Sequence, residues 1–335
     1  MEQRIKDRYT PEILQQAMDL YSIQEDQIKI LDSFESFIYE FSNDNGSFIL
    51  RISHSIRRDK KLIQGEVDWI NFLATCGVGV AKTILSADGN LVESISDHQG
   101  GHFLTTAFKK AKGASPWGRW SPLLYKIYGE EIGKMHKFSQ QYQPSSPEFK
   151  RPEWDDLIFN FVEPFLPESE KTILEKYQQV CTQVNKIPKT NETYGLIHQD
   201  AHGGNLFIDD QDRFTFFDFD DCGYSWFIND IAIVLFYLIA IAEDKVTITK
   251  EFLPNFLGGY LHHCDLNLDL LNEIPHFLKI REIELFSVIH RDFNPEEIND
   301  NWIKEFMKDR KHNIEHDVPF VDFDFNSIQP FIEES

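Results

Sequence analysis

The chain has 335 residues, of which 41% are hydrophobic and 14% aromatic, and its formal net charge is −22 at pH 7. This length predicts two lobes or domains, and the apolar content is sufficient for a folded core, which excludes an intrinsically disordered protein. This large negative charge repels the phosphate backbone of nucleic acids, so neither DNA nor RNA is expected as a partner. It favours a cationic ligand instead.

The N-terminus, the apolar runs and the cysteines indicate the compartment. The first eight residues contain no apolar segment of the kind found in signal peptides. The longest apolar run, 231–242, is too short to span a bilayer and predicts a buried helix. The four cysteines lie far apart and form no CxxC pair, which is typical of reduced packing residues. We therefore expect a cytoplasmic protein that does not associate with membranes.

In chain order, the first hundred or so residues predict an antiparallel sheet with helices added. Thr10 and Pro11 favour a helix start, and the apolar spacing extends that helix over 10–22. A second helix is predicted over 57–76, where Gly77 would end it. β-favouring residues and turn residues, among them Asp44-Asn45-Gly46 and Asp88-Gly89, predict strands within 28–52 and over 82–87, 90–96 and 102–108.

The chain becomes mainly helical after Lys112-Gly113. Two short strands joined by a polar turn are predicted near 205–208 and 213–217. The sequence therefore predicts an α+β protein, with a sheet-rich N-terminal region followed by a larger helical one. Helical spacing predicts helices over 123–138, 154–165 and 168–184, and a mainly helical region from Asp230 onward.

One segment carries residues suited to phosphoryl transfer. It contains His198 and Asp200, with Asn205 five residues after the aspartate and Asp218 thirteen residues beyond that asparagine. An aspartate can accept the proton of an attacking hydroxyl, while an amide oxygen and a second carboxylate hold Mg²⁺ against the phosphates of ATP. The predicted hairpin between Asn205 and Asp218 folds the chain back. We therefore expect ATP and Mg²⁺ as cofactors.

Two other interpretations of this segment compete. Asp and Asn are common in loops, so each of these residues alone would be ordinary, but the full set at this spacing is not. His198, Asp200 and His202 alternate, so in a strand they would share one face and could bind zinc. Gly203-Gly204 indicates a loop, and a zinc site would leave Asn205 unexplained. We rank the zinc interpretation below phosphoryl transfer.

The N-terminal region offers a cation for the phosphates. Glu66 lies in the apolar stripe of the 57–76 helix, and a carboxylate on a buried face needs a partner. Arg51, on the preceding strand, is the predicted partner, because a strand cation held by a helix Glu can reach the ATP phosphates. The alternative is a solvated Glu66 at the edge of the stripe.

From about residue 28 to about residue 290, the sequence resembles the aminoglycoside phosphotransferase-like family of protein-kinase-like enzymes. The His198–Asn205 segment with Asp218 carries the resemblance, and the segments 48–52 and 132–136 support it, together with Gly113 after Ala107-Phe108. The resemblance implies a protein-kinase-like two-lobed fold. Its parts would be a nucleotide-binding lobe at 1–107, a helical lobe at 108–335, a catalytic loop at 198–205 and a metal-binding segment at 217–221.

The resemblance also implies roles for individual residues. Asp200 would be the catalytic base, Asn205 and Asp218 the metal ligands, and Arg51 and Glu66 the phosphate-side pair. His198 would support the catalytic loop, and Asp230 would brace it while serving as the N-cap of the following helix. ATP would contact the backbone near Thr106, Ala107 and Phe108, and acceptor contacts would come from Asp220, Asp221, Glu282 and Glu284.

The sequence departs from the family pattern in three places. The nucleotide loop usually contains glycine, but the stretch 32–37 has none, so phosphate contacts would fall to its backbone and to the hydroxyls of Ser33 and Ser36. Arg51 stands where protein kinases use Lys, which keeps the charge but changes the geometry. Asp218-Phe219-Asp220 replaces the kinase D-F-G, and losing that glycine disfavours a flipping switch.

Three functions remain open at this point. The first is a kinase that phosphorylates a hydroxyl of a small molecule, with a cationic acceptor favoured by the charge. The second is a protein Ser/Thr kinase of the same fold. The third is a nucleotide-binding protein without catalysis, for which the glycine-free loop argues. The presence of Asp200, Asn205 and Asp218 together argues against the third.

Overall fold

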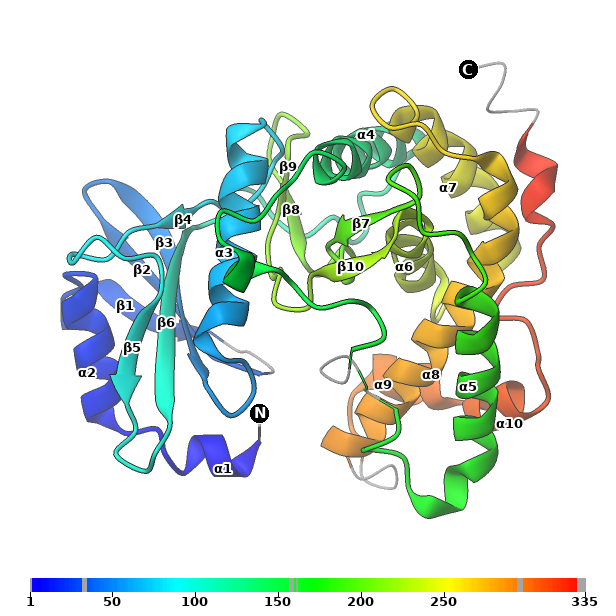
Figure 1. Cartoon of the computed structure of the whole chain (residues 1–335). Coiled ribbons are helices and arrows are strands. Elements are labelled where there is room, and N and C mark those ends of the chain that lie inside the picture. The colour runs from blue at the N-terminus through cyan, green and yellow to red at the C-terminus, as the bar shows by residue number, and fades with distance from the viewer. Residues whose placement is uncertain (1, 32–34, 157–159, 161, 294–297, 330–335) are drawn as a thin grey trace. The chain divides into compact units, whose positions relative to one another are not determined.

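The computed structural model describes residues 2–31, 35–156, 160, 162–293 and 298–329. It divides into two compact units, and each is described by itself with the element labels of Figure 1. The chain passes between the units more than once. The first unit comprises Met1–Ala114, Tyr142–Arg151 and Phe207–Asp220, and the second comprises Ser115–Gln141, Pro152–Leu206 and Asp221–Ser335.

A six-stranded antiparallel sheet forms the centre of the first unit. Its order is β1-β2-β3-β6-β4, and β5 also pairs with β6. Gly46 lies in the β2–β3 turn with φ +128°, a conformation that glycine adopts readily. The predicted antiparallel sheet is therefore confirmed. Its strands are β1 (Ile28–Leu31), β2 (Phe37–Asn43), β3 (Gly46–His54), β4 (Thr83–Ile84), β5 (Glu93–Ser96) and β6 (His102–Lys109).

Two helices, α2 and α3, cover opposite faces of this sheet (Figure 1). Ile13 of α2 belongs to the core that contains Phe103, whereas Val67 of α3 packs in the core that contains Leu104. Phe103 and Leu104 are neighbours in β6 and point to opposite faces. Both predicted helices are confirmed, and Gly77 follows α3 with φ +83°. The helices of this unit are α1 (Gln3–Lys6), α2 (Pro11–Leu20), α3 (Lys60–Thr75) and the 3₁₀ turns η1 (Glu25–Gln27) and η2 (Pro147–Phe149).

A hairpin follows the catalytic loop, as the sequence predicts. Its strands are β8 (Leu206–Ile208) and β9 (Phe214–Phe216), which pair with each other. Phe216 continues the pairing on its other side, because its amide donates to the carbonyl of Gly79 (2.8 Å) and its carbonyl accepts from the amide of Ala81 (2.8 Å). The end of β9 is therefore fixed to the segment that follows α3.

The second unit is mainly helical, as predicted, with a small two-stranded sheet. β7 (Tyr194–Ile197) pairs antiparallel with β10 (Gly223–Trp226), and neither strand is predicted from the sequence. The central helix α6 (Phe227–Ile239) is buried almost throughout. The other helices are α4 (Pro122–Ser139), α5 (Lys171–Val184), α7 (Lys245–Tyr260), α8 (Ile274–Asp292), α9 (Asn301–Met307) and α10 (Arg310–Glu315), with the 3₁₀ turns η4 (Glu168–Glu170), η5 (Leu268–Glu273) and η6 (Phe325–Ile328).

The helix predicted over 154–165 is wrong for the residues that the structure describes there. Glu153 forms a parallel bridge with Tyr224, and the amide of Trp154 donates to the carbonyl of Tyr224 (2.8 Å). The segment therefore begins as an extension of β10 rather than as a helix, and its later part is a series of turns around Pro164. Residues 157–159 and 161 lie outside the described ranges.

The described residues after α10 pack against the helices of the second unit. Phe320 stacks on Phe236 with ring centroids 4.5 Å apart, and its carbonyl accepts from Lys245 Nζ (3.1 Å). Phe325 is also buried. Over the ranges that the structure describes, no helix combines the length and apolar character needed to cross a membrane.

Helices α4 and α7 cross at glycines, which allows their backbones to touch. A Cβ added at Gly129 would overlap the carbonyl oxygen of Phe256, and one at Gly259 would overlap the carbonyl oxygen of Lys126. The side chain that every other residue carries cannot be accommodated here without moving one helix. We therefore expect Gly129→Ala to lower the free energy of unfolding by about 1–3 kcal/mol, measured by urea denaturation.

The matched control for this substitution is Gly258→Ala. Gly258 lies in α7 beside Gly259 but is partly exposed. Alanine there is expected to leave stability unchanged or to raise it by up to about 1 kcal/mol through its better helix propensity. Equal stabilities for the two variants would contradict the proposed close approach of α4 and α7.

Candidate active site

The catalytic loop begins where β7 ends, and a buried carboxylate anchors it. Asp230 is fully buried and accepts hydrogen bonds from the amides of His198 (3.0 Å) and Gln199 (2.8 Å). His136 Nε2 lies 3.1 Å from the same carboxylate. The predicted contact between Asp230 and the loop is therefore present. The predicted N-cap role is wrong, because Trp226 is the N-cap of α6 and Asp230 lies inside the helix.

Asp200 is held by its neighbours in the loop. The side-chain amide of Asn205 donates to Asp200 Oδ2 (2.7 Å) and to the Asp200 carbonyl (3.0 Å), and His202 Nε2 lies 3.4 Å from Oδ2. The structure thus brings the predicted base and one predicted metal ligand together. Because the amide nitrogen of Asn205 makes these bonds, its amide oxygen is the atom that a cation would bind.

An arginine that the sequence does not single out also contacts the base. Arg281, on α8, donates through Nη2 to Asp200 Oδ1 and to the hydroxyl of Tyr237 (2.8 Å). Burial alone would raise the pKa of Asp200, but the charges of His202 and Arg281 lower it below its usual range. These charges favour the ionised carboxylate, which is the form that a general base needs before it accepts a proton.

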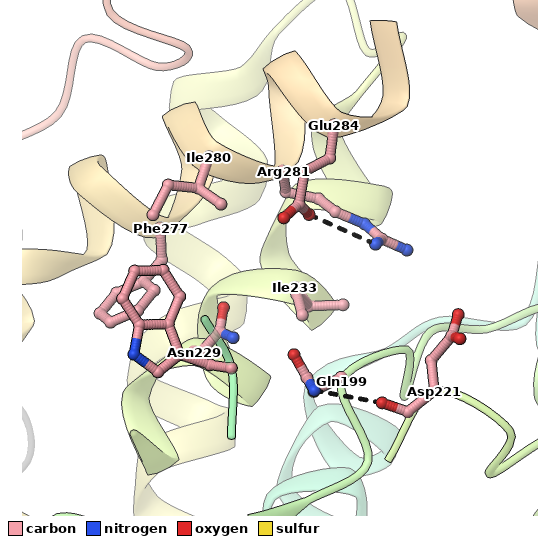
Figure 2. A pocket seen from close by; sticks show the side chains of 9 residues that line it. Gln199, Asp221, Asn229, Ile233, Phe277, Ile280, Arg281 and Glu284 are labelled. Atoms are coloured by element: carbon pink, nitrogen blue, oxygen red, sulfur yellow. Dashed lines mark hydrogen bonds and ion pairs between the residues drawn. The ribbon is translucent and has the colours of Figure 1, made fainter. Parts of the chain in front are cut away.

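A polar pocket adjoins this arginine. Gln199 Nε2 donates to the carbonyl of Asp221 (3.1 Å), and Figure 2 shows Arg281 and Glu284 extending from α8 on the other side of the pocket. Burial raises the pKa of Glu284 to about 7, against the opposing charge of Arg281. Two of the predicted acceptor residues, Asp221 and Glu284, thus line one pocket. Its full lining is Trp154, Gln199, Asp221, Asn229, Ile233, Phe277, Ile280, Arg281 and Glu284.

The other two predicted acceptor residues have structural partners instead. Glu282 is 1% exposed and accepts from Arg310 Nη1 (2.6 Å). Asp220, in the first unit, is 7% exposed and pairs with Arg57, while its carbonyl accepts from Arg151 Nη2 (2.7 Å). Both predictions are wrong, because arginines already neutralise these buried carboxylates. For Asp220, burial opposes ionisation, but the surrounding arginine charges lower its pKa below the usual range.

The predicted ion pair on the phosphate side is present in the first unit. Arg51 Nη1 and Nη2 donate to Glu66 Oε1 (2.8 Å) and Oε2 (2.7 Å), so the pair is bidentate. Arg51 is 5% exposed and Glu66 is 1% exposed. The solvated alternative for Glu66 is therefore wrong. Arg51 Nε also donates to Thr106 Oγ1 (3.3 Å), which fixes the guanidinium against β6.

The other predicted ATP contacts lie at or near the same sheet. Ser36 is buried, with Oγ 3.0 Å from Ser53 Oγ, and Ser33 lies outside the described residues. Thr106, Ala107 and Phe108 lie in β6, which is paired with β3 on one side and with β4 and β5 on the other. The sheet therefore already pairs this strand on both sides, and adenine binding near these residues stays a prediction. Beyond the end of β6 at Lys109, the amide of Lys110 still donates to the carbonyl of Ser47 (3.0 Å).

Asp218 follows β9 on a well-anchored segment of the first unit. It is exposed and has φ +61°, a left-handed conformation that aspartate tolerates better than most residues. The next residue, Phe219, is 1% exposed and packs edge-on against Trp69 of α3, with ring centroids 5.4 Å apart. Buried neighbours thus hold an exposed carboxylate at the end of the hairpin. Asn205, the other predicted ligand, belongs to the second unit.

The zinc interpretation finds no geometric support. His198 is fully buried, and its Nδ1 accepts a hydrogen bond from the amide of Asp200 (3.3 Å), so that nitrogen is not a ligand. Within the described ranges, no group of three or more His, Cys, Asp and Glu side chains is placed to hold a metal ion. His198 instead packs in the core and bonds to the loop, as expected from the sequence.

Known proteins share the sequence and the fold of this chain. The phosphotransferase enzyme family matches residues 27–271. An amicoumacin kinase from Bacillus subtilis (strain 168) is 34% identical over 322 residues, which cover 95% of each chain. A solved amicoumacin kinase in complex with AMP-PNP, Ca²⁺ and Ami has 34% identity and a TM-score of 0.92, over 98% of this chain and 100% of that chain. A microcompartment-associated aminopropanol kinase, at 21% identity, shares the fold, with a TM-score of 0.73 over 91% of this chain and 95% of that chain.

These likenesses confirm two predictions made from the sequence. The α+β, protein-kinase-like fold is that of the solved relatives, and the phosphotransferase class is that of the family. The match covers both units, because residues 27–271 include the sheet, the catalytic loop and α6, which lines part of the pocket. The chain belongs to the phosphotransferase enzyme family.

Proposed function

We propose that this chain transfers the γ-phosphoryl group of ATP to a hydroxyl of a small molecule in the cytoplasm, with Asp200 as the base. The hydrogen bond from Asn205 to the ionised carboxylate of Asp200 carries the proposal, because it joins the base to a residue that can hold a metal. The free state of all four cysteines is consistent with a reducing compartment.

The transfer step uses Asp200 directly. The acceptor oxygen attacks the γ-phosphorus, its proton passes to the Asp200 carboxylate, and the bond from the γ-phosphorus to the β–γ bridging oxygen breaks to release ADP. Asp230 keeps the loop in place, since it bonds the amides of His198 and Gln199. These fixed contacts orient the carboxylate before the substrates arrive.

The residues expected to hold Mg²⁺ have suitable chemistry. Mg²⁺ prefers hard oxygen ligands, and Asn205 and Asp218 offer an amide oxygen and a carboxylate on either side of the β8–β9 hairpin. The bound cation would neutralise charge on the β- and γ-phosphates. The relative solved with AMP-PNP and Ca²⁺ supports a nucleotide with a divalent cation, and Mg²⁺ is our proposal for this chain.

Arg51 is proposed to contact the phosphates, with Glu66 fixing its orientation. Both guanidinium Nη atoms are bonded to Glu66, so the arginine is pre-oriented and ordering it costs little on binding. Ser33 and Ser36 remain proposed contacts of the phosphate loop. For adenine, we propose the backbone that follows β6, at Ala111 and Lys112, in place of the strand itself.

The acceptor is proposed to bind in the pocket beside Arg281, with Asp221 providing negative charge for a cationic group and Glu284, whose pKa is raised to about 7, providing hydrogen-bonding oxygens. Amicoumacin is the first acceptor to test, because the relatives that are 34% identical over nearly the whole chain are amicoumacin kinases. The same relatives favour the small-molecule kinase over the protein kinase, because their acceptor is a small molecule.

The test is Mg²⁺-dependent ADP release by the purified protein with amicoumacin, an aminopropanol, an aminoglycoside and homoserine as separate acceptors. We expect one acceptor to gain the mass of a phosphoryl group, and EDTA to abolish that gain. The proposal fails if isothermal titration calorimetry detects no binding of Mg-ATP. A protein substrate phosphorylated in preference to all small molecules would instead revive the second function.

A further inference from the structure

Two tryptophans of the second unit lie against the catalytic loop, and the transfer step does not use them. A Cβ built on Gly203 would lie 3.1 Å from Cζ2 of Trp117 and 3.2 Å from Cζ2 of Trp120, so both indoles meet the loop at this glycine. Gly203 follows Asp200 by three residues, which keeps the two Cα atoms within about 11 Å of each other. A small molecule whose hydroxyl reaches the base can therefore also reach the tryptophans.

A tight turn over 116–119 presents Trp117 to solvent. A hydrogen bond of 2.9 Å joins the first carbonyl of this turn to its last amide, and Gly118 has φ +81°, as the third position of a type II turn requires. Trp117 stands at the corner of the turn and is 49% exposed, which makes it the most exposed of the six tryptophans. Just before the turn, Ser115 Oγ donates to the carbonyl of Gly203 (3.1 Å) and fixes the turn to the loop.

Trp120 is held from behind by α4. Its ring is nearly parallel to that of Tyr128 (3°, centroids 5.4 Å apart) and to that of Tyr125 (20°, 5.6 Å). The Tyr128 hydroxyl in turn donates to the carbonyl of Ala201 in the catalytic loop. Trp117 meets Trp120 edge-on, with the ring planes at 85° and the centroids 6.3 Å apart. The two indoles thus form an aromatic corner, in which one wall is fixed by packing and the other is open to solvent.

The aromatic corner is suited to a planar aromatic ligand. Aromatic rings bind one another by offset stacking or by edge-to-face contact, and two perpendicular indoles offer both contacts to one ring. The corner belongs to the same unit as Asp200 and the pocket beside Arg281, whereas Arg51 and Ala111, which are proposed to contact the nucleotide, belong to the first unit. We therefore assign the corner to the acceptor rather than to adenine.

We infer that Trp117 and Trp120 bind a planar aromatic group of the acceptor and make the protein prefer acceptors that carry such a group. This inference rests on the proposed function and adds a substrate class to it. The preferred acceptor is a small amphipathic molecule, with its aromatic group at Trp117, its hydroxyl at Asp200 and its cationic group at Asp221. An acceptor without an aromatic group loses the contact with the corner and keeps the other two.

The test compares two probes that differ by one phenyl ring. The plain probe is 1-amino-2-propanol, and the aromatic probe is the same molecule with a phenyl group on its methyl carbon. Isothermal titration calorimetry gives the dissociation constant of each probe for the wild-type protein and for Trp117→Ala, Trp117→Phe and Leu123→Ala. Leu123 is the matched control, because it is a large apolar residue of the same unit, lies in the first turn of α4 and is 59% exposed.

The phenyl group is expected to tighten binding to the wild-type protein by about tenfold, because the aromatic corner adds stacking to the burial of one ring. Trp117→Ala should abolish this advantage, and Trp117→Phe, which keeps a ring at the position, should retain part of it. Leu123→Ala should retain all of it, which separates the corner from a general effect of exposed apolar side chains. The affinity of Trp117→Ala for Mg-ATP should stay within about twofold of the wild-type value.

Equal affinities of the two probes for the wild-type protein would overturn the inference, as would a phenyl advantage that persists in Trp117→Ala. A marked loss of Mg-ATP affinity in that variant would overturn it too, because the corner would then belong to the nucleotide site. Failure of the proposed function is distinguishable, because the probe measurements involve no phosphoryl transfer.

A second measurement uses the wild-type protein alone and covers the case in which Trp117→Ala does not fold. Acrylamide quenches the fluorescence of exposed tryptophans, and Trp117 is the most exposed of the six. The aromatic probe should reduce this quenching, and the plain probe at the same fractional saturation should not. Equal quenching with the two probes would contradict the assignment of the corner to an aromatic group.

Discussion

Asp200→Asn is expected to lower kcat for phosphoryl transfer by about 10²–10⁴-fold, because an amide cannot take the proton of the attacking hydroxyl. The substitution keeps the size of the side chain. Its oxygen can still accept from Arg281 or from Asn205, so the loop should remain folded. The measurement is steady-state ADP release at saturating ATP and acceptor, together with the dissociation constant of Mg-ATP. We expect that dissociation constant to change far less than kcat.

The control for this prediction is Asp210→Asn. Asp210 lies in the exposed turn between β8 and β9, so it tests removal of a carboxylate without touching the base. Its kcat should stay close to that of the wild-type protein. If Asp200→Asn kept more than a tenth of the wild-type kcat, Asp200 would not be the base.

Glu66→Gln should destabilise the first unit strongly. It would leave the charge of Arg51 buried without an opposite charge, and breaking a buried pair in this way typically costs about 3–5 kcal/mol. The Arg51–Glu66 pair is a buried ion pair of this kind, because its contact is bidentate and both side chains are buried. The measurement is the free energy of unfolding from urea denaturation, followed by a probe in the sheet of the first unit.

The double variant Arg51→Met with Glu66→Leu separates stability from function. Two apolar side chains of similar volume should restore much of the lost stability, since no buried charge then remains unpaired. The affinity of the double variant for Mg-ATP should be lower than that of the wild-type protein, because the proposed contact between Arg51 and the phosphates is lost. Glu175→Gln is the control, because it breaks the exposed Lys171–Glu175 pair and should have no measurable effect. Full ATP affinity in the stable double variant would exclude Arg51 from the phosphate site.

Local patterns in the sequence predict most of the first unit and of the catalytic loop. Apolar spacing and turn residues are local patterns, so they are sufficient to predict elements built from consecutive residues. The predictions of α2, α3 and the β2–β3 hairpin are confirmed. The pair of Arg51 and Glu66 can also be predicted from the sequence, because a carboxylate in an apolar stripe needs a nearby cation when it is buried. The same reasoning gives no sign of β7 and β10. These four-residue strands are short, and residues 198–222 separate them in the chain, so neither strand has a local pairing partner.

Contacts between distant helices set the limit of sequence reasoning. Arg281 lies 81 positions from Asp200, and no local pattern marks it as a partner. Glu282 and Glu284 look equivalent in the sequence, yet they lie about 200° apart around α8. One therefore faces Arg310 in the core and the other faces the pocket. Which carboxylate meets the pocket depends on how α8 is rotated against its neighbours, and packing of the whole unit decides that rotation.

The anchoring of the catalytic loop by Asp230 has a consequence for hydrogen exchange. The amides of His198 and Gln199 donate to a carboxylate that is fully buried beneath the loop and also contacts His136 of α4. Opening the loop alone would leave that carboxylate without its donors in the core, which is strongly unfavourable. We therefore expect these two amides to exchange with solvent only when α4 and α6 separate, which would place the catalytic loop in the slowest-exchanging part of the second unit.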